Sequence, residues 1–104
     1  MKSVHWLPEG DSIRPATALE WQEEFEQKLF PVVARTSSAF GPFIATWFTG
    51  TDHGTEAERA DPNALPRVWR TSWYPHGMHH AATRTEYTQT REQARLMHAE
   101  FCRQ

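Results

Sequence analysis

Apolar residues follow a helical spacing near the N-terminus of the chain. They are Ala18, Trp21, Phe25 and Leu29, which fall on one face of a helix. Thr17 and Glu20 form a capping-box pattern, in which each side chain accepts a hydrogen bond from a backbone N–H of the first turn. Pro31 cannot continue a helix. The pattern predicts a helix that begins at Thr17 and is ended or kinked by Pro31.

A second helical pattern lies at the other end of the chain. Thr90 and Gln93 again form a capping-box pattern, and the apolar face behind it consists of Ala94, Met97, His98 and Phe101. We therefore predict a helix that runs nearly to the C-terminus. His98 lies within its apolar face, so we expect a core histidine whose polar tip is hydrogen-bonded to backbone.

Three stretches between these helices favour β-strands, namely residues 43–49, 68–74 and 81–88. In the second stretch Trp69, Thr71 and Trp73 share one face, and Val68, Arg70, Ser72 and Tyr74 share the other. The third stretch is polar, which suits an edge strand. Because the short connections leave no room for βαβ crossovers, we predict an α+β fold. It is a three-stranded antiparallel meander, centred on residues 68–74 and flanked by an N-terminal and a C-terminal helix.

The remaining segments show neither helical spacing nor strand alternation of apolar residues. Residues 1–16 contain two prolines and are predicted to form an extended arm anchored by Trp6 and Leu7. Residues 35–42 are turn-prone, and Pro75-His76-Gly77 has the chemistry of a tight turn. Residues 51–66 are acidic and are predicted to form a long exposed loop, which is usually functional or disordered at this length. The chain of 104 residues fits a single domain.

Composition adds a charge asymmetry to this picture. The formal net charge is −2, but residues 1–65 carry −5 and residues 66–104 carry +3. The two oppositely charged halves could simply complement each other within one domain, or their charges could be solvated surface. Alternatively, the second half could form a basic face for an acidic partner. The longest apolar stretches fall short of a membrane span, and the N-terminus lacks the apolar region of a signal peptide. Together with the lone Cys102, which has no partner for a disulfide, this predicts a cytoplasmic protein.

The candidates for metal binding and catalysis are weak. His76, His79 and His80 crowd one turn and could bind zinc, with His98 and Cys102 as further ligands, or could be exposed turn histidines. Cys102 lies at a helix C-terminus, which disfavours a catalytic thiolate. The acidic residues of the 51–66 loop do not have EF-hand spacing. Because nucleotide-binding and hydrolase motifs are absent as well, we predict no enzyme, no cofactor and no metal site.

Binding is the function that remains. The chain has five Trp and six Phe, and a surplus of aromatic and arginine side chains is typical of interface hot spots. We predict a noncatalytic protein-interaction domain that binds through sheet residues Arg70, Trp73, Tyr74 and Arg84. The same residues could instead form a stacking platform for single-stranded nucleic acid. The sequence leaves the oligomeric state open, a homo-oligomer included.

Two segments carry a resemblance to a known group. They are Pro42-Phe-Ile-Ala-Thr-Trp-Phe48 and Thr83-Arg-Thr-Glu-Tyr-Thr-Gln-Thr-Arg-Glu-Gln-Ala94, the latter followed by His98. They resemble small uncharacterised proteins encoded by tailed phages, over about half of the chain. The long acidic loop and the histidine turn depart from that group, which has no assigned activity to carry over. The resemblance implies a phage accessory protein that acts by binding, in the virion or against a host factor.

Overall fold

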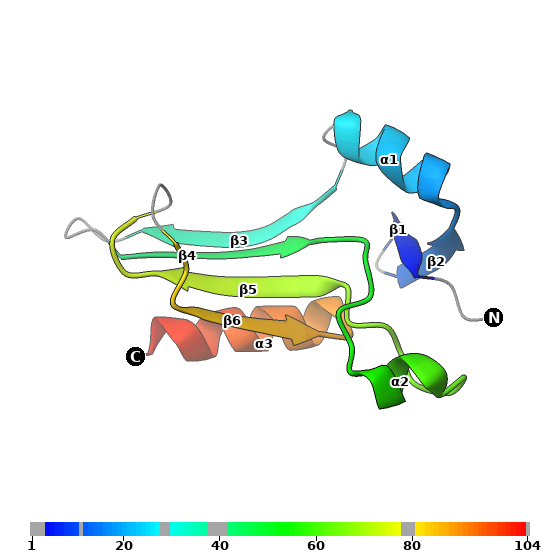
Figure 1. Cartoon of the computed structure of the whole chain (residues 1–104). Coiled ribbons are helices and arrows are strands. Elements are labelled where there is room, and N and C mark those ends of the chain that lie inside the picture. Colours follow the sequence, from blue (N-terminus) through cyan, green and yellow to red (C-terminus); the bar gives the residue numbers. More distant parts are fainter. Residues whose placement is uncertain (1–3, 11, 28–29, 38–41, 78–80, 104) are drawn as a thin grey trace.

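The computed structural model describes residues 4–10, 12–27, 30–37, 42–77 and 81–103. It contains two antiparallel sheets and three helices (Figure 1). In chain order the elements are β1 (His5–Glu9), β2 (Ser12–Ala16), α1 (Ala18–Glu26), β3 (Val32–Ser37), β4 (Phe43–Phe48), α2 (Glu56–Ala60), β5 (Trp69–Tyr74), β6 (Arg84–Thr88) and α3 (Arg91–Cys102). The α+β class is confirmed.

The main sheet has four strands in the order β3-β4-β5-β6, so the prediction of three strands is wrong. The missed strand is β3, which overlaps the stretch predicted as a turn and ends in the polar residues Arg35, Thr36 and Ser37. Polar residues suit this place, because β3 is an edge strand that pairs with β4 alone. The register shifts between Val32 and Ala34, so Val33 is the extra residue of a bulge and packs against the core. Two other predictions for this sheet are confirmed, since β5 lies inside the sheet and polar β6 forms its second edge.

The N-terminal segment is a β-hairpin rather than an extended arm. β1 pairs with β2 in antiparallel register, and Gly10 has a φ of 61° in the connection. The sequence hides this hairpin because each strand carries a proline, which edge strands tolerate. The predicted anchors are confirmed, since Leu7 is buried and Trp6 packs against the core.

Helix α1 begins at the predicted cap. The Oγ1 of Thr17 accepts from the backbone N–H of Glu20, and the Glu20 carboxylate accepts from the N–H of Thr17. The helix ends at Glu26, and Leu29 of the predicted apolar face lies outside the described residues. The Trp21 indole N–H donates to the carbonyl oxygen of Thr49 over 3.0 Å. This bond ties α1 to the end of β4.

Helix α3 lies along one face of the main sheet and contacts all four strands (Figure 1). Its buried residues Ala94, His98 and Phe101 confirm the predicted apolar face. The Thr90 cap is confirmed too, but the Gln93 side chain accepts from the N–H of Gln89 instead of closing the predicted box. The core between α3 and the sheet is formed by Phe48, Val68, Trp69 and Ala94.

The hairpin and α1 extend past one end of the main sheet (Figure 1). The molecule measures 45 × 30 × 24 Å, and its radius of gyration is 14.2 Å. A chain of this length is ordinarily more compact, at roughly 13 Å. Within the described ranges, no helix is long and apolar enough to cross a membrane.

Candidate functional site: the open sheet face

The two faces of the main sheet differ in what covers them. Thr46 of β4 contacts His98 of α3, and Arg84 of β6 contacts Phe101 of α3. The strand residues that lie in register with Thr46 therefore point toward α3. Alternate residues point away. On β3 to β6 the outward residues are Val32, Arg35, Ser37, Phe43, Ala45, Trp47, Arg70, Ser72, Tyr74, Thr85 and Tyr87. We call this set the open face, because among the described helices α3 alone packs extensively on the sheet.

The open face is organised as rows across the strands. One row pairs Phe43 with Tyr74, whose ring centroids are 5.9 Å apart. Another pairs Trp47 with Arg70, whose guanidinium carbon lies 4.9 Å from the indole centroid. The row between them has small residues at Ala45 and Ser72, both buried. The two aromatic rows are four residues apart, or roughly 13 Å, and so flank a trough.

The trough opens into a groove of about 720 Å³ that is closed at one side by the end of α1. We call it the aromatic groove. Its lining residues are Phe25, Glu26, Phe30, Val32, Arg35, Phe43, Ala45, Trp47, Phe48, Thr49 and Tyr74. Phe25 and Val32 are 57% and 44% exposed, respectively, although both are large and apolar. The volume lies in the range of about 300–1,000 Å³ that is typical of ligand-binding clefts.

Two arginines of the open face are not paired with carboxylates. Arg70 lies over the Trp47 ring and donates from Nε to the Ser72 hydroxyl over 3.0 Å. Arg35 is exposed and makes no hydrogen bond or ion pair with any residue that the structure describes. Glu26 lines the groove from the α1 side. The groove therefore combines aromatic walls with a free guanidinium at the β3 side and a carboxylate at the α1 side.

The structure divides the four predicted binding residues between the two faces. Arg70 and Tyr74 lie on the open face. Trp73 and Arg84 lie on the face that α3 covers, where the Arg84 guanidinium carbon is 4.4 Å from the centroid of the Phe101 ring. The alternation in residues 68–74 predicted which side chains share a face, but only the packing of α3 determines which face is open.

Three prominent groove residues were not among the predicted binding residues, namely Phe43, Trp47 and Arg35. Phe43 and Trp47 alternate along the strand predicted for residues 43–49, so their shared face could have been noted. No alternation of this kind marks Arg35, because it begins the turn-prone stretch of residues 35–42.

The acidic segment 51–66 is largely exposed, as predicted, but it is not a loop throughout. It contains α2, which has a complete capping box between Thr55 and Glu58. The buried carboxylate of Asp52 accepts from the backbone N–H groups of Gly54 and Arg67 at 2.8 and 3.0 Å. A buried carboxylate needs such donors to offset its lost hydration.

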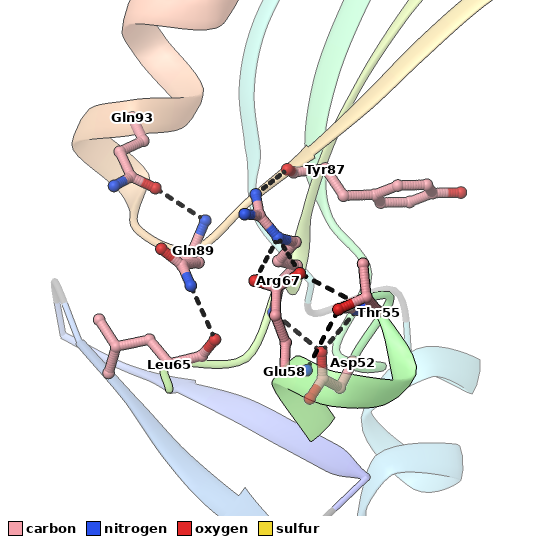
Figure 2. Close-up of polar contacts among 9 residues, drawn as sticks. Asp52, Thr55, Glu58, Leu65, Arg67, Tyr87, Gln89 and Gln93 are labelled. Atoms are coloured by element: carbon pink, nitrogen blue, oxygen red, sulfur yellow. Dashed lines mark hydrogen bonds and ion pairs between the residues drawn. The ribbon is translucent and has the colours of Figure 1, made fainter. Parts of the chain in front are cut away.

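Arg67 fastens α2 to the sheet (Figure 2). Its Nε donates to the Glu58 carboxylate over 2.9 Å, and its Nη1 donates to the carbonyl oxygen of Tyr87 over 2.9 Å. The backbone N–H of Thr55 and then the Arg67 guanidinium lower the pKa of Glu58. The carboxylates of Asp52 and Glu58 therefore make contacts within the chain.

His53 and Tyr87 extend the open face beyond Arg70. Their rings are stacked, with centroids 4.1 Å apart. His53 is exposed at its edge, but contact with the Tyr87 ring removes water from one side of the imidazole. This desolvation and then the charge of Arg70 lower the pKa of His53.

His98 is buried, as predicted, but its partners are side chains rather than backbone. Its Nδ1 lies 2.9 Å from the Thr46 hydroxyl, and its Nε2 lies 2.9 Å from the Thr36 hydroxyl. Thr46 also contacts the Thr71 hydroxyl at 2.8 Å. A neutral imidazole donates from one nitrogen and accepts at the other, so either tautomer satisfies this network. Burial lowers the pKa of His98 below its ordinary value of 6.5.

This network predicts an acid-sensitive stability. With a lowered pKa, folded His98 binds fewer protons than unfolded His98, so acid favours the unfolded chain. The free energy of unfolding should decline as pH falls below about 6.5 and level off below the folded pKa. The free energy of unfolding should be measured by denaturant titration between about pH 7.5 and about pH 5.5. Glu20 and Glu58 do not titrate in this interval, because their pKa values are lowered.

An NMR titration assigns this effect to one residue. The His98 ring protons should titrate with a midpoint below 6.5, and His98→Gln should flatten the decline. His53→Gln is the matched control, and it should leave the His98 part of the decline in place. A His98 midpoint at or above 6.5 would contradict the prediction.

The candidate zinc ligands of the alternative interpretation are not brought together in the described part of the chain. His79 and His80 lie outside it. Both ring nitrogens of His98 are engaged with threonines, while Cys102 is exposed. Among the described residues, no group of three or more histidine, cysteine, aspartate or glutamate side chains could hold a metal ion.

Comparisons with known proteins found no match to this chain among protein-family models, curated proteins or solved structures.

Proposed function

We propose that this protein is a noncatalytic interaction domain that binds another protein through the aromatic groove. The observation that carries the proposal is a sheet face with aromatic walls and two arginines without carboxylate partners, next to the exposed side chains of Phe25 and Val32. Contiguous exposed apolar surface is costly in water and marks binding sites in soluble proteins. Aromatic and arginine side chains also supply most of the binding energy in protein interfaces.

The groove suits a segment of a partner better than a flat contact. A fully buried Phe or Val side chain is stabilised by roughly 1.5–3 kcal/mol relative to an exposed one. A partner that covers Phe25 and Val32 therefore gains affinity from this chain's own exposed residues. The walls of Phe43, Tyr74 and Trp47 offer it a preformed recess.

Selection from a random peptide library displayed on ribosomes tests this function. The wild-type domain should enrich peptides that Trp47→Ala and Phe25→Ala variants fail to bind. Leu96→Ala is the matched control, because Leu96 is 63% exposed on α3 away from the groove. Failure to enrich any peptide that depends on the groove would contradict the proposal, provided that circular dichroism shows the variants folded.

Single-stranded nucleic acid is the second candidate, favoured by the open-face rings near Arg35 and Arg70. Bases stack on such rings, and phosphates pair with guanidinium groups. Oligothymidylate binding, followed by Trp fluorescence, should then weaken steeply between roughly 50 and roughly 200 mM salt. Binding that is absent at low salt, or insensitive to salt, would rule against this candidate.

The biological setting of the protein is a proposal from the sequence resemblance alone. The segments 42–48 and 83–94 support an accessory protein of a tailed phage, located in the host cytoplasm or in the virion. Mass spectrometry of purified virions distinguishes the two locations.

A further inference from the structure

We infer that the aromatic groove recognises a peptide segment with one large apolar anchor and a single carboxylate beside it. This inference rests on the proposed function and specifies the chemistry of the partner. The anchor would lie over Ala45, and the carboxylate would pair with Arg35.

The position of the anchor follows from the register of the sheet. Ala45 lies between Phe43 and Trp47 on β4 and has the smallest side chain of the three. Its neighbour on β5, Ser72, is covered by Arg70, whose Nε bonds the Ser72 hydroxyl. The recess is therefore closed on the β5 side and open on the β3 side. An apolar side chain that enters it contacts the Phe43 and Trp47 rings on either side.

The position of the carboxylate follows from Arg35. Arg35 pairs with Ala45 across β3 and β4, so the two side chains emerge next to each other on the open face. Arg70 is engaged with Trp47 and Ser72, whereas Arg35 has no partner among the described residues. A guanidinium matches a carboxylate in charge and in bidentate geometry. Arg35 is thus placed to bind a carboxylate on the residue next to the anchor.

A carboxylate among the lining residues limits how much negative charge the groove accepts. Glu26 lines the groove from the end of α1. No ion pair joins Glu26 to Arg35 in the part of the chain that is described. A run of carboxylates or a phosphate backbone would bring several negative charges into the groove that Glu26 lines, and like charges repel. A single carboxylate paired with Arg35 brings only one negative charge, so a peptide is favoured over nucleic acid.

Three synthetic peptides test this inference. Each is a capped nonapeptide of glycine and serine with a central tryptophan, which is followed by glutamate, glutamine or lysine. Binding is measured by NMR from the amide shifts of Ala45 and the indole shift of Trp47. We expect the glutamate peptide to bind about two- to fivefold more tightly than the glutamine peptide, and the lysine peptide to bind most weakly.

Variants of this chain assign the discrimination to Arg35. Arg35→Gln should bind the glutamate and glutamine peptides equally, and Arg35→Glu should prefer the lysine peptide. Arg95→Gln is the matched control, because Arg95 is exposed on α3 and does not line the groove. Equal binding of all three peptides by the wild-type domain would overturn the inference. So would discrimination that survives in Arg35→Gln.

The outcomes separate this inference from the function on which it rests. If all three peptides bind equally and Trp47→Ala abolishes binding, the interaction domain stands and the carboxylate preference fails. If no peptide binds here and none is enriched from the library, both fail. Tighter binding of oligothymidylate would replace the peptide by nucleic acid. Dimerisation in light scattering that Phe25→Ala abolishes would replace it by a second copy of this chain.

Discussion

Replacement of Gly50 by alanine is expected to lower the free energy of unfolding by about 3 kcal/mol. Gly50 has a φ of 72°, a left-handed conformation that costs a residue with a Cβ about 1–2 kcal/mol. A Cβ at this position would also overlap the indole of Trp21 and approach the carbonyl oxygen of Trp6. Overpacking of this kind adds about 1–3 kcal/mol.

The expected loss of stability is large because the N-terminal hairpin and α1 both contact the chain at Gly50. The backbone N–H of Trp6 donates to the Gly50 carbonyl oxygen over 2.7 Å, which joins the N-terminal hairpin to the end of β4. The Trp21 indole donates to the neighbouring Thr49 carbonyl oxygen, which joins α1 to the same point. A displaced Trp21 would loosen both the hairpin and the wall of the aromatic groove.

Gly10→Ala is the matched control for this substitution. Gly10 has a φ of 61°, but a Cβ there meets no atom within 4 Å. Only the conformational cost of about 1–2 kcal/mol applies to it. Urea unfolding followed by Trp fluorescence should therefore give a clearly larger loss for Gly50→Ala. Equal losses would show that the contact with Trp21 contributes nothing.

The substitution Thr46→Val is expected to lower the free energy of unfolding by about 2–3 kcal/mol. Valine has nearly the shape of threonine, so the change removes a hydroxyl and leaves no cavity. Thr46 and Thr71 are fully buried, and His98 is 6% exposed. Without Thr46, both His98 Nδ1 and the Thr71 hydroxyl lose a hydrogen bond in a site that water does not reach.

Two further variants separate this effect from a general loss of packing. Thr36→Val removes the other histidine partner, but Thr36 is exposed and water can replace its hydroxyl, so the loss should stay below about 1 kcal/mol. The triple variant Thr46→Val, Thr71→Val, His98→Leu removes every member of the inner network. It should be more stable than Thr46→Val alone, because no buried polar group is left unpaired. Thermal unfolding gives the order, and a triple variant less stable than Thr46→Val would contradict this account.

Local signals along the chain predicted a large part of the fold. Thr17 and Thr90 cap helices through contacts within one turn, so a few neighbouring residues suffice to identify them. The strands at residues 43–49 and 68–74 were found from alternation and β-branched content. His98 was placed in the core from helical spacing alone.

Elements that depend on distant partners were missed. β3 is a short edge strand with apolar residues only in its first half, and its pairing with β4 is not visible in its own residues. The N-terminal hairpin carries a proline in each strand and is held by Gly50, which lies far along the sequence. The acidic segment resembled a solvated loop, although Arg67 and the buried Asp52 fasten it to the sheet.

The candidate site shows the same division. The alternation along β5 was enough to predict that Trp69 and Trp73 share one face and that Arg70 and Tyr74 share the other, since successive side chains on a strand point to opposite faces. The packing of α3 then covers the face of Trp73 and Arg84 and leaves Tyr74 and Arg70 open. The tertiary structure also brought Arg35, Trp47 and Phe25 together in one groove. Strand periodicity is a local property, but the choice of the face that α3 covers depends on packing between residues far apart in the chain.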